Sequence, residues 1–115
     1  IVMDDTTCMV TATLRLAKFF AHESCGQCTP CREGTNWMKI LLQRIASGQG
    51  AESDLDLLAR VVPNVGGISL CALGDAAQGP VRSLVDKFSD EIGENLRAGR
   101  YPTPLPRYFD QGAAA

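Results

Sequence analysis

The sequence predicts an all-α fold, a bundle of about four helices. Apolar side chains recur every three or four residues in successive segments, which is the spacing of one face of an α-helix. No segment after residue 3 shows a convincing strand pattern, and no internal repeat is present. With 115 residues, 45% of them hydrophobic, the chain is long enough for one domain with its own core.

The first helix is expected to begin within Asp4–Thr7, because Asp and Thr side chains cap the unpaired N–H groups of a helix start. Its apolar face is expected to consist of Val10, Leu14, Ala17 and Ala21, with Met9, Leu16 and Phe20 beside them. Cys8 is expected in the first turn, as a buried free thiol. A polar stripe opposite predicts that only one side of this helix is buried.

The second helix is predicted from Thr29 as N-cap and Pro30 at the first helical position, where a missing N–H costs nothing. Its expected buried residues are Trp37, Met38, Leu41, Leu42 and Ile45, and it stops at Ser47–Gly50.

A third helix is expected from Ser53 or Asp54, and Pro63 with the glycines after it ends that helix. Its buried set is Leu55, Leu58, Val61 and Val62. A fourth helix is expected from about Ala76 or Pro80, followed by a short helix that ends near Gly99. Cys71 is thereby placed on a connection.

The ends of the chain differ from this helical part. Ile1–Met3 resembles the tail of a strand, so residues 1–4 are interpreted as the end of an upstream domain and residues 1–99 as the helical domain. Residues 100–115 carry prolines at three alternate positions, which favours an extended tail.

Charge and hydropathy exclude two classes of partner. The net charge is −2 and the basic residues are scattered, so a nucleic acid is not expected as a partner. No apolar run approaches the roughly 20 residues that span a bilayer, so direct membrane insertion is not expected.

Four of the five cysteines form a pattern. Cys25, Cys28 and Cys31 stand at every third position, and Cys71 follows much later in the chain. A 4Fe-4S cubane needs one thiolate at each of four corners, and a tight loop that supplies three with a remote segment that supplies the fourth meets this need. Gly26 lets the backbone turn sharply between ligands. Cys31, near a helix N-terminus, would meet unpaired N–H groups that stabilise thiolate charge.

Other interpretations of these cysteines remain open. A structural zinc site also takes four thiolates but usually pairs two with two, whereas here the division is three and one. A zinc-stabilised interaction module without a redox role is the alternative. A dithiol redox motif at Cys25 and Cys28 would belong to a βαβ fold, which this chain does not predict. His22, the single histidine, is expected at most near the cluster rather than bound to it.

Two segments carry a resemblance to a known family. His22–Thr35, with the sequence HESCGQCTPCREGT, and Leu70–Ala77, with the sequence LCALGDAA, resemble the C-terminal region of the NADH-binding flavoprotein subunit of respiratory complex I. Related flavoprotein subunits of NAD-reducing hydrogenases and NAD-dependent formate dehydrogenases carry the same module. The resemblance covers about residues 1 to 88.

The resemblance implies a helical bundle whose 4Fe-4S cluster is ligated by Cys25, Cys28, Cys31 and Cys71. It implies that electrons come from reduced FMN in the preceding domain, which also binds NADH, and leave to neighbouring iron–sulfur subunits. The parent would be a peripheral NADH dehydrogenase (quinone) on the cytoplasmic or mitochondrial-matrix side. Because this sequence holds no Gly-rich phosphate-binding loop, we expect the chain alone not to oxidise NADH, and no catalytic residue is assigned.

Overall fold

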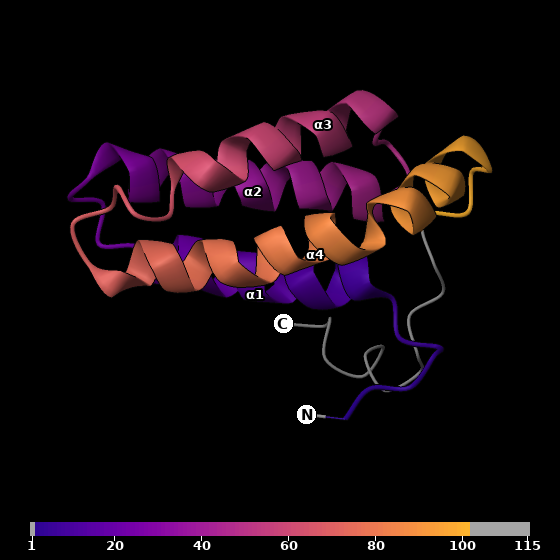
Figure 1. Cartoon of the computed structure of the whole chain (residues 1–115), viewed down its shortest axis with the longest axis horizontal. Helices are drawn as coiled ribbons and strands as arrows, with labels where there is room; N and C mark the ends of the chain where they lie inside the picture. The colour runs from indigo at the N-terminus through magenta and orange to yellow at the C-terminus, as the bar shows by residue number, and fades with distance from the viewer. Residues whose placement is uncertain (1, 102–115) are drawn as a thin grey trace, which may run out of the picture.

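Four α-helices make up most of the computed structural model, which describes residues 2–101 (Figure 1). The elements are α1 (Met9–Glu23), α2 (Thr29–Ala46), α3 (Glu52–Val61), the short 3-10 helix η1 (Val62–Asn64) and α4 (Ala72–Arg97). No strand occurs between residues 2 and 101. The predicted all-α bundle is therefore confirmed.

The helices form a bundle in which α1 and α3 stand at opposite corners. Each of these two helices contacts both α2 and α4, and α2 also contacts α4. The loop between α1 and α2 and the loop between η1 and α4 lie at the same end of the bundle (Figure 1). This arrangement brings two cysteine-bearing segments together although they are far apart in the sequence.

The core holds these helices together through apolar packing. Its largest fully buried side chains include Met38, Leu42, Ile45, Leu58, Val65 and Val81. Burying a side chain of this size stabilises the fold by about 1.5–3 kcal/mol. Every residue predicted for the buried face of the third helix lies in this core, and so do Val10, Leu14 and Ala17 of the first.

The start of α1 corrects one prediction. The Asp4 carboxylate accepts hydrogen bonds from the Thr6 N–H at 3.1 Å and from the hydroxyls of Thr6 at 2.7 Å and Thr7 at 3.1 Å. These residues form a turn before the helix, because such side chains bond to nearby backbone as readily as they cap a helix. The helix begins at Met9, and Cys8 is its N-cap rather than a residue of its first turn.

Two apolar residues predicted on or beside buried faces are exposed. Trp37 keeps 55% of its surface accessible and Leu16 keeps 46%. Each stands at the edge of the apolar face of its helix. The buried face of α1 is centred on Val10, Leu14 and Ala17, and that of α2 on Met38, Leu42 and Ile45. Thr13 and Thr35 occupy the core side instead.

The last helix corrects a second prediction. Instead of a helix from Ala76 or Pro80 and a separate short one, a single helix runs from Ala72 to Arg97 with Pro80 inside it. A proline inside a helix costs about 3 kcal/mol. The helix nevertheless continues, since apolar residues on both sides of Pro80, such as Ala77 and Val81, are buried in the core. Cys71 lies on the connection before α4, as predicted, and is its last residue, the N-cap of α4.

The described chain ends in a turn after α4. Tyr101 returns to the core and is 9% exposed. The prolines of the predicted extended tail lie outside the described residues, and the assignment of residues 1–4 to an upstream domain stays a prediction. No helix within residues 2–101 combines the length and the apolar character needed to cross a membrane.

Candidate iron–sulfur centre

The loop between α1 and α2 carries three of the predicted ligands. α1 ends at Glu23, and its C-cap Ser24 donates a backbone N–H to the Phe20 carbonyl. Gly26 then adopts a positive φ of 77°, a conformation that L side chains rarely tolerate. This turn separates Cys25 from Cys28, as the sequence predicted.

Arg32 holds this loop in place from the first turns of α2. Its Nη1 donates a hydrogen bond to the Gly26 carbonyl at 2.6 Å, and its Nε lies 3.0 Å from the Glu33 carboxylate. The guanidinium therefore ties the Gly26 turn to the helix and places a positive charge beside the cysteine loop.

Two of the four cysteines are helix N-caps. Cys28 caps α2, and Cys71 caps α4. Neither helix has a side-chain oxygen bonded to its first N–H groups. The positive ends of two helix dipoles are therefore available to stabilise negative charge on sulfur. The sequence predicted Thr29 as the N-cap of the second helix and Cys31 in its first turn; the structure confirms the place of Cys31, but the N-cap is Cys28, one residue earlier. The helix N-terminus at Cys71 was missed because the start of the fourth helix was placed too late.

The loop before Cys71 is fixed by its own contacts. The Gly67 N–H donates to Asp75 Oδ1 at 2.6 Å, and the Ser69 hydroxyl donates to the Val65 carbonyl at 2.8 Å. A Cβ placed on Gly74 would overlap the Ser69 side chain. These contacts pack the segment closely onto α4.

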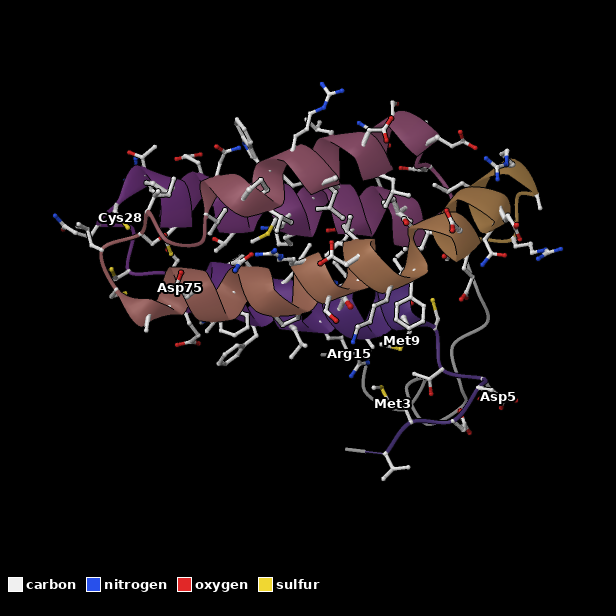
Figure 2. All side chains as sticks on the ribbon, viewed as in Figure 1. Met3, Asp5, Met9, Arg15, Cys28 and Asp75 are labelled. Carbon is white, nitrogen blue, oxygen red and sulfur yellow. The ribbon has the colours of Figure 1, made fainter. Side chains whose placement is uncertain are left out.

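The two cysteine loops meet at Cys28. The pKa of the Cys28 thiol is lowered, chiefly by hydrogen bonding from the backbone N–H of Leu70. Burial acts in the opposite direction, and the N–H of Cys31 adds to the lowering. The residue next to Cys71 thus contacts the first loop, and Cys28 and Asp75 lie at one end of the bundle (Figure 2).

Cys31 is the most enclosed of the predicted ligands. Its side chain is buried, whereas Cys25 and Cys71 are exposed. The Ser24 hydroxyl lies 3.3 Å from its sulfur, and the buried Thr35 hydroxyl donates to its backbone carbonyl at 2.7 Å. Cys31 is therefore held by contacts from both the end of α1 and the first turns of α2.

The remaining candidates lie apart from this group. Cys8 caps the N-terminus of α1, one helix length away from the cysteine loops. For 15 residues this length is about 22 Å. His22 is exposed and pairs with the neighbouring Glu23 carboxylate at 3.0 Å. Neither residue joins the four cysteines.

The geometry tests which metal group the thiols fit. Among residues 2–101, no three Cys, His, Asp or Glu side chains stand close enough to share one metal ion. A zinc site requires all its sulfurs at about 2.3 Å from a single centre. In a cubane each thiolate binds a different iron, so its sulfurs stand farther apart. The donor set itself, four thiols on two adjoining loops with two helix N-termini beside them, is the chemistry that an iron–sulfur cluster takes.

A helical bundle that presents cysteines from two adjoining loops in a three-plus-one pattern belongs to the class of iron–sulfur domains. Comparison with known proteins identifies the family. Residues 11–95 match the NADH-ubiquinone oxidoreductase-F iron-sulfur binding region, and the chain belongs to this family. The cofactor of the family is a 4Fe-4S cluster, as the sequence predicted.

Named relatives agree with this assignment. The chain is 47% identical over 98 residues to the corresponding subunit of the NADH-quinone oxidoreductase of Rhodobacter capsulatus, and the match covers 85% of this chain and 23% of the relative. It is 50% identical over 93 residues to the same subunit from Streptomyces coelicolor, with 81% and 21% covered. The chain thus spans less than a quarter of these relatives.

A solved structure supports the fold. The crystal structure of an NAD+-reducing [NiFe]-hydrogenase in the H2-reduced state is similar to this chain with a TM-score of 0.75 and 38% identity. The match covers 81% of this chain and 16% of that one.

Proposed function

We propose that Cys25, Cys28, Cys31 and Cys71 ligate one 4Fe-4S cluster and that the chain serves as an electron-transfer module. The observation that carries this proposal is the close packing of Val65, at the start of the segment that leads to Cys71, against Gly34 of α2. The lowering of the Cys28 pKa by the Leu70 N–H agrees with it. The bound cluster supplies reversible one-electron transfer. The protein supplies the four thiolates and surroundings that stabilise their charge.

Exposure at the site suggests how electrons enter and leave. Cys25 and Cys71 are exposed, while Cys31 faces the interior. Ile68 and Leu70 beside Cys71 are exposed apolar residues, at 56% and 78%. A partner that covers these residues would exclude water and approach the cluster closely. The cluster would therefore exchange electrons through this end of the bundle.

The partners follow from the family. We propose that this chain is part of a flavoprotein subunit that oxidises NADH, and that the cluster accepts electrons from reduced FMN in the rest of that subunit. The electrons then pass to neighbouring iron–sulfur subunits of a peripheral NADH:quinone oxidoreductase assembly, on the cytoplasmic or mitochondrial-matrix side. Because the sequence holds no Gly-rich phosphate-binding loop, the chain alone should not oxidise NADH.

The test compares the chain with the intact subunit that contains it. Reconstituted anaerobically, the chain should contain iron and sulfide at four per chain and no stoichiometric zinc. Its cluster should be reduced by dithionite and not by NADH. In the intact subunit NADH should reduce the same cluster. Stoichiometric zinc without iron would instead support the zinc-stabilised module and refute the electron-transfer function.

A further inference from the structure

Ser24 contacts a predicted cluster ligand from a different element. Its Oγ lies 3.3 Å from Cys31 Sγ. Ser24 is the C-cap of α1, whereas Cys31 lies in the first turn of α2. The backbone on each side is held, by the bond from the Ser24 N–H to the Phe20 carbonyl and by the bond from Thr35 Oγ1 to the Cys31 carbonyl. Ser24 and Cys31 can therefore keep these positions when the cluster assembles.

The direction of the hydrogen bond changes when metal binds. In the free chain either the hydroxyl or the thiol can donate. A thiolate bound to iron has no proton, so Ser24 becomes the donor and the sulfur the acceptor. The contact is partly buried, and a hydrogen bond is electrostatically stronger away from water.

Such a bond favours the reduced cluster. One-electron reduction adds negative charge that spreads over iron, sulfide and the ligand sulfurs, and a donor stabilises the more negative state more strongly. Hydrogen bonds to the sulfurs are among the factors that set the potential of iron–sulfur centres.

We propose that Ser24 is a positioning residue that raises the reduction potential of the cluster through its hydrogen bond to Cys31. This inference rests on the proposed ligand set. The Ser24 hydroxyl bonds to the ligand sulfur and is not itself a ligand, so it acts on the potential rather than on the presence of the cluster.

The test is a redox titration of the reconstituted full chain, monitored by electron paramagnetic resonance. Ser24→Ala should retain four irons, but at a fixed ambient potential its ratio of reduced to oxidised cluster should fall by up to about tenfold. For a one-electron couple that change corresponds to about 59 mV. The exposed Ser83 of α4 provides the control, and Ser83→Ala should titrate like the wild type.

A matched pair separates the hydroxyl from the shape of the side chain. Ser24→Thr keeps the hydroxyl, and Ser24→Val has the same shape without it. The threonine variant should titrate at the higher potential. Equal potentials in this pair, or cluster loss from both variants that lack a hydroxyl, would overturn the tuning role. A wild-type chain that assembles no cluster would instead refute the proposed function.

Discussion

Val65 occupies the space beside Gly34 so fully that a Cβ on that glycine would overlap Val65 Cγ2. Gly34 lies on α2 just after the loop of three cysteines, and Val65 begins the segment that leads to Cys71. The two halves of the site are therefore in contact because position 34 lacks a side chain.

Gly34→Ala tests this contact. We expect it to destabilise the fold by about 1–3 kcal/mol, the usual cost of an added methyl in a packed interior, and to lower iron retention. Gly93→Ala is the matched control, because a Cβ on that helical glycine of α4 meets nothing closer than 3.9 Å and alanine favours a helix by about 0.5–1 kcal/mol. Urea unfolding measures both variants. Equal stability of the two would show that the contact is unimportant.

Asp75→Ala tests the anchor of the second loop. The Gly67 N–H loses its acceptor in this variant, and because the bond is exposed, water can replace it. We therefore expect the loss of one ordinary hydrogen bond, about 0.5–1.5 kcal/mol. The cluster should also be released faster to an iron chelator, since the loop carries Cys71. Asp90→Ala, at an exposed position of the same helix, should release iron at the wild-type rate. Identical rates in the two variants would contradict the anchoring role.

Single cysteine substitutions test the ligand assignment. Cys71→Ser should lose or degrade the cluster, because one corner of the cubane loses its thiolate. Cys8→Ser should retain it, because Cys8 lies at the far end of α1. Iron content and the absorption spectrum of the reconstituted chains measure both. Equal damage from the two substitutions would overturn the assignment.

The pKa of Cys28 gives a pH dependence in the metal-free chain. Hydrogen bonding from Leu70 lowers this pKa below the ordinary value of 9.0, so the folded state favours the thiolate. The resulting stabilisation is present above the unfolded pKa and is lost as the pH falls through the folded pKa. Alkylation of Cys28 by iodoacetamide, followed by mass spectrometry, should reach half its maximal rate at a lower pH in the folded chain than in urea. The same midpoint in both would contradict the contact with Leu70.

The sequence was sufficient to predict the number of main helices and to group the four cysteines as candidate ligands. Apolar periodicity is a local property, and Cys25, Cys28 and Cys31 stand at regular intervals. Helix boundaries were less predictable. The Asp4 side chain formed a turn with Thr6 and Thr7 instead of capping a helix, and tertiary burial carried α4 through Pro80.

The supporting residues of the site could not be predicted. Ser24 and Ser69 read as ordinary loop serines, and their roles depend on how α1, α2 and α4 pack together. Position 34 likewise requires a residue without a side chain only because Val65, which is distant in the sequence, packs against it. Only the packed bundle brings these residues together.

The most direct test of the account is a crystal structure of the reconstituted chain with an anomalous difference map at the iron absorption edge. We predict one compact group of four irons at the end of the bundle, with Cys25, Cys28, Cys31 and Cys71 each bound to a different iron. A single metal ion shared by the thiols, or a cluster to which Cys71 is not bound, would contradict it.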